Sequence, residues 1–364
     1  MAAAREFPET RMRVGRFGFQ EGMRVPMAVG PWMVTPNGEQ TAAALGVMID
    51  DAVGMEVHNQ RPAGAHTVTT ELSVDIVLPP PWSGPELVAT ARLAGTGPTD
   101  GVSRGEVRDG DGRLLAVATG RSRFVPATGI HADVASLERE PAQRIMPADH
   151  RTILEVLGIA DLESALTLDV TGGADTGVHV SSAAQVPSTV DRTGVDARVP
   201  APRPTADDGR DGGSQVAAAL VASGRTAGVA LAAGPATSAP ATPAAPATPA
   251  TPAALAAAPL SARLVVPPVQ ALANGSGTMH GGLLLACSDL AAAGLAGALG
   301  PRPASDYTAS LRLNLLRPGL LDEPVIFTAR VVNRGRSISV YRVTSHGRAG
   351  RPYTVATVTR ASKS

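Results

Sequence analysis

The sequence predicts an α+β protein built from two copies of one unit, each a long apolar helix followed by four antiparallel strands. Two observations carry this prediction. One helix and four strand-like segments occur twice in the same order along the 364 residues. A single offset of 238 residues also relates three pairs of blocks, which indicates an internal repeat: Asp51 with Asp289, Thr90–Arg92 with Thr328–Arg330, and Val117–Thr119 with Val355–Thr357.

In the first unit, Ala42 to Val57 is the long helical candidate near the start of the chain. Four segments rich in alternating and β-branched residues follow it and predict strands. Asp109-Gly110-Asp111-Gly112 supplies a hairpin turn between the last two. The predicted strands are Thr67–Leu78, Glu86–Leu93, Gly101–Val107 and Leu114–Val125.

The second unit repeats this order, beginning with a helix from Gly281 to Ala298. Both helices carry few charges, as expected of helices that each cover the face of a sheet. The four strands predicted after the second helix are Ala309–Leu316, Pro324–Asn333, Ser337–Ser345 and Pro352–Arg360.

Between the units, residues 172–260 consist mainly of Ala, Pro, Thr, Gly and Ser, and this composition predicts a long disordered linker. Ile153–Ile159 and Ala165–Val170 look ordered and are interpreted as a connecting helix and strand at the front of unit two. The expected domains are therefore unit one over 15–130, the connecting elements over 145–171, the linker over 172–260, and unit two over 261–364.

Composition restricts the partners. The net charge is +0 and the pI is about 7.1, which predicts neither a nucleic-acid partner nor an anionic membrane. A single cysteine, Cys287, suits a reducing compartment. The first residues lack an apolar signal core, so we expect a cytoplasmic protein. The histidines show no metal-ligand spacing and no nucleotide motif is present, so neither a metal nor a cofactor is expected.

The most informative stretch runs from Asn274 through His280-Gly281-Gly282 into an apolar helix that carries one acid, Asp289. An unpaired charge on so apolar a segment is costly to bury, which favours a cavity or chemistry. The amides at a helix start suit a carbonyl oxygen that becomes negative during acyl transfer. Together with a carboxylate, these groups could hydrolyse an ester or thioester.

This pattern resembles the hotdog-fold acyl-CoA thioesterases of the phenylacetate-pathway (PaaI-like) type. The resemblance is clear from about Ser261 to Arg360 and weaker from about Met23 to Val125, where Asp51 is retained. It implies a double hotdog, in which two fused units, each a long helix wrapped by an antiparallel sheet, replace a dimer. Ser310 resembles the polar residue that the family has on the strand after the helix.

By this resemblance the site lies between the units. The Gly281 amide would polarise the thioester carbonyl, with Asn274 and His280 ordering that corner, and the facing unit would give the acid as base or nucleophile. Asp51 would then face the intact corner. Asp289 would face an altered one, because the offset carries His280-Gly281-Gly282 onto Ala42-Ala43-Ala44. Asp50, next to Asp51, leaves the position of the first acid open by one residue.

Acyl-CoA is accordingly the expected partner. Gly282 would let it approach the backbone, and Arg334 and Arg336 could meet its phosphates. Two alternatives to hydrolysis stay open. One is a non-catalytic acyl-CoA binding or regulatory module. The other is an enoyl-thioester hydratase, which would need an Asp–His pair on one helix, whereas His58 comes seven residues after Asp51. A homodimer of such fused chains is also left open.

Overall fold

The computed structural model describes residues 7–15, 17–19, 22–35, 40–127, 152–159, 165–169, 261–299 and 306–362. The linker predicted over 172–260 lies outside these residues, as do residues 128–151.

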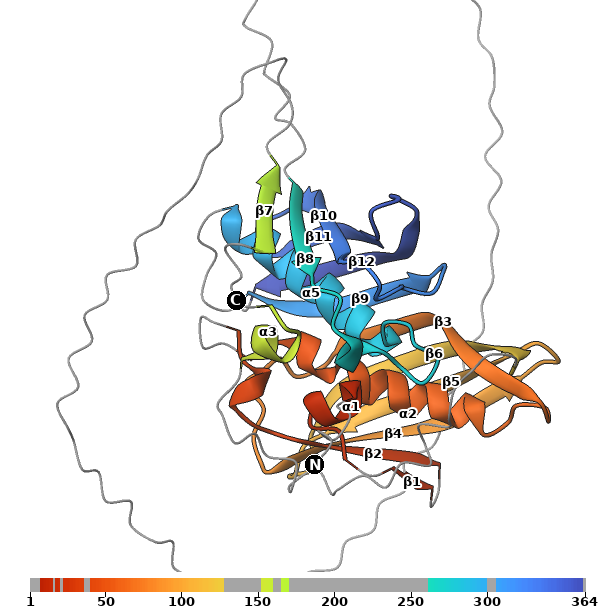
Figure 1. Ribbon diagram of the computed structural model, residues 1–364. Coiled ribbons are helices and arrows are strands. Elements are labelled where there is room, and N and C mark those ends of the chain that lie inside the picture. The colour runs from red at the N-terminus through yellow and green to blue at the C-terminus, as the bar shows by residue number, and fades with distance from the viewer. Residues whose placement is uncertain are drawn as a thin grey trace, which may run out of the picture. The chain divides into compact units, whose positions relative to one another are not determined.

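Unit one is a helix followed by the four predicted strands, preceded by short elements that the sequence did not predict (Figure 1). The helix begins at Ala42, as predicted, with a 3₁₀ turn before the α-helix proper. The elements are α1 (Pro8–Arg11), β1 (Gly18–Phe19), β2 (Met23–Ala28), η1 (Pro31–Met33), η2 (Ala42–Leu45), α2 (Gly46–His58), β3 (Ala65–Ile76), β4 (Glu86–Thr96), β5 (Asp100–Arg108) and β6 (Leu114–Pro126).

Unit two repeats this order, and its helix has the bounds that the sequence predicted. The short strand before the helix, β8, was not predicted, just as β2 was not. The elements from the connecting segment onward are α3 (Ile153–Val156), β7 (Leu166–Asp169), β8 (Ser261–Val266), η5 (Gln270–Leu272), α5 (Gly281–Ala298), β9 (Asp306–Leu315), β10 (Val325–Arg334), β11 (Ile338–His346) and β12 (Pro352–Ser362).

Within the described parts of the chain, the two units share one antiparallel sheet of twelve strands in the order β1-β2-β4-β5-β6-β3-β9-β12-β11-β10-β8-β7. The order is symmetric about the middle of the sheet, because each strand of unit one and its counterpart in unit two lie at the same distance from the β3–β9 pair. β3 and β9 join the halves, with Glu71 opposite Asn314 and Asp75 opposite Ser310. Each half wraps its own helix (Figure 1), so the chain is two fused hotdog units, as predicted.

The helices α2 and α5 cross where Gly46 meets Gly282. A Cβ atom on either glycine would overlap the carbonyl oxygen of the other, so the two backbones are in direct contact. α5 is long and apolar enough to cross a membrane by length and composition, but 78% of it is buried inside the protein. Its composition is therefore that of a core helix. Cys287 lies fully buried on it, and burial raises the pKa of this thiol.

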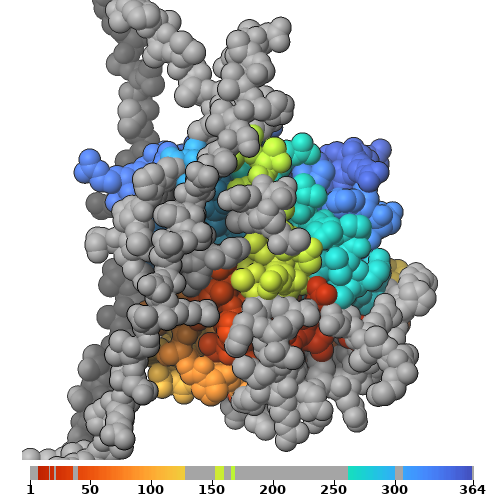
Figure 2. All heavy atoms as spheres, turned by 60° about the vertical axis from the view of Figure 1, so that its left-hand side comes forward, coloured from red at the N-terminus to blue at the C-terminus, as the bar shows by residue number. Residues whose placement is uncertain are grey.

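The connecting elements contact both units. β7 pairs with β8 at the edge of unit two, where the connecting strand was expected. The helix α3 instead lies against η1 of unit one, where the amide of Ile153 donates to the carbonyl of Val34. Gly158, just after α3, lies close to Val269 of unit two. Figure 2 shows this yellow-green segment at the surface beside red and teal residues of the two units.

Candidate functional site

His280 caps the start of α5. It is the residue directly before the helix, and its Nδ1 lies 3.1 Å from the amide nitrogen of Gly282. Asn274 orders the preceding turn, because its Oδ1 accepts from the amides of Ser276 and Thr278 at 2.9 and 3.2 Å. The side-chain oxygen of Asn274 is thus used within its own turn.

Both acids of α2 lie against this corner. Asp51 Oδ1 is 3.3 Å from His280 Nε2, and Asp50 Oδ2 is 3.3 Å from His280 Nδ1. Asp50 Oδ2 also accepts from the Gly282 amide at 2.8 Å. A Cβ atom on Gly281 would lie only 2.5 Å from the same oxygen. The Asp50 carboxylate therefore binds the Gly282 amide and lies against Gly281, at the helix start where the sequence predicts a thioester carbonyl.

The charge of this corner is shared among buried groups. Burial alone would lower the pKa of His280, but its hydrogen bond to Asp51 and the charges of Asp50, Asp51 and Glu9 outweigh burial and raise it to about 9. Near neutral pH the ring is therefore an imidazolium among carboxylates. Ligand atoms of Glu9, Asp51 and His280 all lie within 4.8 Å of one another, as in a metal site. A metal ion would have to displace the proton of His280 to bind there.

The second acid, Asp289, lies on α5 and is 1% exposed. Two hydroxyl groups hold its carboxylate: Thr41 of unit one donates to Oδ2 at 3.2 Å, and Thr308 of β9 donates to Oδ1. Arg360 donates to the Thr308 hydroxyl oxygen at 2.8 Å. A hydroxyl has one proton, so this contact from Arg360 directs the Thr308 proton to Asp289. Arg360 itself pairs with Asp306 at 3.4 Å.

A pocket opens against Asp289. The space among its lining residues amounts to about 260 Å³, a figure that includes open solvent. Both units contribute, and Ala42 places the start of the unit-one helix on its wall. The lining residues are Ala42, Ile49, Val74, Ile76, Leu285, Asp289, Thr308 and Leu311.

The two acid positions are related by the internal repeat. Asp50 accepts from Thr69 at 2.9 Å, as Asp289 accepts from Thr308, and acid and threonine are 19 residues apart in both pairs. By these contacts Asp50 is the structural counterpart of Asp289. The 238-residue offset in the sequence instead matches Asp289 with Asp51, the next residue along the chain. Likewise Thr41 caps η2 by accepting from the Ala43 amide, as His280 caps α5.

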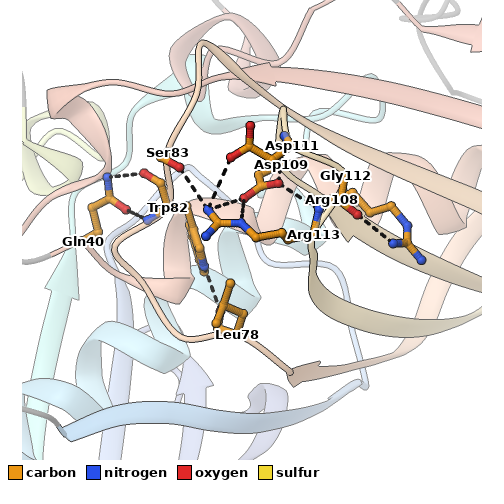
Figure 3. Close-up of polar contacts among 9 residues, drawn as sticks. All are labelled: Gln40, Leu78, Trp82, Ser83, Arg108, Asp109, Asp111, Gly112 and Arg113. Carbon is orange, nitrogen blue, oxygen red and sulfur yellow. Dashed lines mark hydrogen bonds and ion pairs between the residues drawn. The ribbon is translucent and has the colours of Figure 1, made fainter. Parts of the chain in front are cut away.

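A polar loop contact fixes the segment that carries Thr41. Gln40 accepts from the amide of Trp82 at 2.7 Å and donates back to its carbonyl, and the Trp82 ring nitrogen donates to Leu78 (Figure 3). In the same view, the Asp109–Gly112 segment forms the predicted turn between β5 and β6. Asp109 accepts there from the backbone and the guanidinium of Arg113.

Ser310, expected to contact the substrate, does not line the pocket. It lies opposite Asp75 on the joined strands, and the Asp75 side chain is about half exposed, so both residues are on the outer face. A β-bulge at this point of β9 brings Thr308 to the inner face. The sequence therefore identified this part of β9, through Ser310, but not Thr308, the residue that meets the acid.

Arg334 and Arg336 lie at the turn after β10. The strand register runs from Arg334 through Ser339 and Arg360 to Thr308. Three strand spacings separate Arg334 from Thr308, or about 14 Å. Arg334 is exposed and donates to the carbonyl of Leu299 at the end of α5. These arginines are thus at the end of the sheet that holds Thr308, but not in the pocket.

Four contributors to the two corners were not singled out from the sequence: Glu9, Thr41, Thr308 and Arg360. Thr41 carried a usable signal, since a threonine directly before an apolar helical run is a preferred N-cap. For Glu9 and Arg360, no local pattern marks a residue that reaches the site only through sheet pairing or a long loop.

Comparison with known proteins agrees with unit two as the clearest part. Residues 270–361 match the family model described as acyl-CoA thioesterase N-terminal domain. No curated protein sequence matches the chain. Among solved structures, the tesB protein of Mycobacterium avium subsp. paratuberculosis is 10% identical, with 98% of each chain covered and a TM-score of 0.48. The acyl-CoA thioesterase II TesB2 of Mycobacterium marinum is 8% identical, covering 98% of this chain and 96% of that one, with a TM-score of 0.48. The Escherichia coli PaaI protein is 20% identical over 29% of this chain and 73% of its own, with a TM-score of 0.27.

Proposed function

We propose that the protein hydrolyses acyl-CoA thioesters to a free acid and CoA, and that the reaction takes place in the Asp289 pocket. The family match of unit two supports the reaction class. The observation that carries the location is the pocket itself, which opens against Asp289 and Thr308. The corner around His280 is filled by the carboxylates of Asp50 and Asp51.

In this proposal Asp289 acts as the general base. It takes a proton from a water molecule whose oxygen attacks the thioester carbonyl carbon, the carbon–sulfur bond then breaks, and the thiolate leaves and is protonated. Thr41 and Thr308 hold the carboxylate in one orientation, so its remaining lone pairs face the pocket. Arg360 keeps the Thr308 proton on that carboxylate.

The start of the unit-one helix would stabilise the developing oxyanion. Ala42 lies on the pocket wall and begins η2, which continues into α2. Backbone amides and the helix dipole supply this stabilisation, and neither depends on a glycine side chain. By the structural correspondence, Thr41-Ala42-Ala43 stands in place of His-Gly-Gly, and this replacement leaves the chemistry of the corner available. This reverses the ranking expected from the sequence, in which Asp51 at the PaaI-like corner was the principal acid.

The test compares two matched carboxylates. Asp289→Asn should lower kcat by about a hundredfold or more, the usual order for loss of a general base, whereas Asp51→Asn should change kcat only a few-fold. Release of free thiol is measured on a panel of acyl-CoAs, with folding of each variant checked by circular dichroism. A large kcat loss in Asp51→Asn with a neutral Asp289→Asn would move the reaction to the His280 corner. Binding of acyl-CoA by the wild type without thiol release would instead make the chain a binding module.

A further inference from the structure

The hairpin of β10 and β11 exposes apolar and basic side chains together. Val332, at the bulge of β10, is 62% exposed, and Ile338, where β11 begins, is 52% exposed. No acid occurs from residue 330 to residue 342, whereas four arginines do, and all four are exposed: Arg330, Arg334, Arg336 and Arg342. An isolated apolar residue at a surface is ordinary, but two of them within a basic hairpin are typical of a binding surface.

The positive charge of this hairpin is not balanced by neighbouring acids. Arg330 lies directly opposite Arg342 in the strand register, and like charges in this position destabilise a sheet. Neither flanking strand, β8 or β12, contains an acid. Within the part of the chain that the structure describes, no carboxylate forms an ion pair with Arg330, Arg336 or Arg342. The zero net charge of the whole chain therefore conceals a local excess of positive charge.

The matching hairpin of unit one, formed by β4 and β5, shows that the fold does not require these side chains. It has the same bulge, between Leu93 and Gly95, and the same opposed pair, Arg92 and Arg104. The 238-residue offset places four different residues at the positions of Val332, Arg334, Arg336 and Ile338, namely Ala94, Thr96, Pro98 and Asp100. Over residues 93–103, unit one therefore forms the same bulged hairpin with neither a large exposed apolar side chain nor an arginine at its tip.

We propose that the β10–β11 hairpin docks the protein onto an anionic lipid surface. The arginines contact the lipid phosphates, and Val332 and Ile338 enter the boundary between headgroups and acyl chains. This proposal goes beyond the proposed function and does not depend on it.

The two apolar side chains favour lipid over other partners. A nucleic acid would engage the arginines through its phosphates but would leave Val332 and Ile338 in water. The aromatic residue of the hairpin, Tyr341, is fully buried and cannot stack on a base. A second copy of the same surface would place arginines against arginines. A lipid surface accommodates the basic and the apolar side chains at once.

Cosedimentation of the full chain with vesicles tests the proposal. Vesicles of phosphatidylcholine with about 30% phosphatidylserine should bind the wild type at least about tenfold more tightly than vesicles of phosphatidylcholine alone. Each arginine near such a surface should contribute about fivefold. Arg330→Gln combined with Arg342→Gln should therefore weaken binding about 25-fold at about 0.1 M salt, and much less at about 0.5 M salt, where charge is screened.

The apolar contribution should not depend on salt in this way. Burial of the exposed half of a Val or Ile side chain strengthens binding by about fivefold. Val332→Ser combined with Ile338→Ser should therefore weaken binding by about 25-fold at both salt concentrations.

Two control variants make the comparison specific. Arg92→Gln combined with Arg104→Gln removes the same charge from the matching strands of unit one. Leu316→Ser removes a side chain that is 51% exposed at the other end of the sheet. Both should bind vesicles within about twofold of the wild type, because neither surface combines the two kinds of side chain. Circular dichroism checks the folding of every variant.

Ile338→Trp reports the contact directly. The two native tryptophans, Trp32 and Trp82, are 0% and 3% exposed, so a vesicle-dependent change in fluorescence comes from the introduced side chain. Its emission should shift to shorter wavelength with phosphatidylserine vesicles, as an indole moves from water into the lipid interface. Leu316→Trp should show no such shift.

The assays contain no acyl-CoA, so their outcome is separate from that of the proposed function. Wild-type protein that stays in the supernatant overturns the docking proposal even if it releases thiol from acyl-CoA. Vesicle binding that requires Val332, Ile338 and the arginines supports it even if no acyl-CoA is hydrolysed.

Three other results would also overturn the proposal. An equal loss of binding in the Arg92 and Arg104 variant would place the contact on the whole sheet face. Displacement from vesicles by free CoA at constant ionic strength would assign the arginines to a soluble phosphate. Binding of a DNA duplex as tightly as vesicles, with no dependence on Val332 and Ile338, would indicate a general polyanion surface.

Discussion

The buried His280 corner should make the stability of the protein depend on pH in a direction that the structure fixes. The folded-state pKa of His280 is raised from its usual 6.5 to about 9 by Asp51, Asp50 and Glu9, against the opposing effect of burial. Between these two values the folded protein holds a proton that the unfolded chain has released. The stabilisation is therefore fully present below about pH 6.5 and is lost as the pH rises through about 9.

The magnitude follows from the width of this window. Each pH unit between the two pKa values changes the free energy of unfolding by about 1.4 kcal/mol for one proton, so the whole window corresponds to about 3 kcal/mol. The buried side chains of the cluster, Glu9, Asp50, Asp51 and His280, join α1, α2 and the start of α5. Its loss should thus appear as a change in global unfolding and not as local fraying.

Urea denaturation of the wild type and His280→Gln from pH 6 to pH 10 measures the effect. The variant should be less stable than the wild type by about 3 kcal/mol at pH 6.5, because the carboxylates lose their cation, and the two curves should converge near pH 10. Other groups that titrate in this range affect both proteins equally. Parallel curves across the window would refute the reasoning, as would a histidine NMR titration that places the pKa of His280 near 6.5.

Two further predictions concern the helix crossing and the arginine turn. Gly46→Ala should lower the free energy of unfolding by about 2 kcal/mol or more, because the added methyl overlaps the Gly282 carbonyl. The control is Gly297→Ala, whose added methyl has nothing within 4 Å. This variant should be as stable as the wild type or more stable in the same urea denaturation assay. Arg334→Ala should raise KM for acyl-CoA several-fold with little change in kcat, whereas Arg351→Ala, exposed at the opposite end of the sheet, should leave steady-state kinetics unchanged. A KM unaffected by loss of Arg334 would show that this turn does not meet the substrate.

The architecture was predictable because it depends on local patterns. The helix of unit two was predicted at its observed bounds, Gly281 to Ala298, from apolar composition and the preceding glycines. The strands after each helix followed from alternation and β-branching. The outer strands β2 and β8 were missed, since each has six residues and β2 contains a proline, Pro26, which argues locally against a strand.

The site was less predictable, because its geometry depends on contacts between distant segments. A one-residue bulge in β9 exchanges Ser310 for Thr308 on the inner face, and no pattern in Thr308-Ala309-Ser310 announces it. The filling of the His280 corner depends on Asp50 reaching across from α2, 232 residues away from Gly282. Sequence motifs identify groups capable of chemistry, but which of them face open space is decided by packing.

Fusion of the two units explains how one chain can hold two such different corners. In a symmetric pair of identical units both corners would have to serve the same purpose, because every substitution would appear in both. Here the corner that keeps His280, Gly281 and Gly282 is occupied by carboxylates of the other unit and binds the units together through buried charge. The corner that lost these residues keeps an acid, an N-cap in Thr41 and a pocket. An oxyanion site made of backbone amides survives replacement of glycine by alanine, whereas a pocket does not survive a carboxylate placed inside it. Under the proposed function, the motif-bearing corner has a structural role, and the reaction takes place at the corner where the motif was lost.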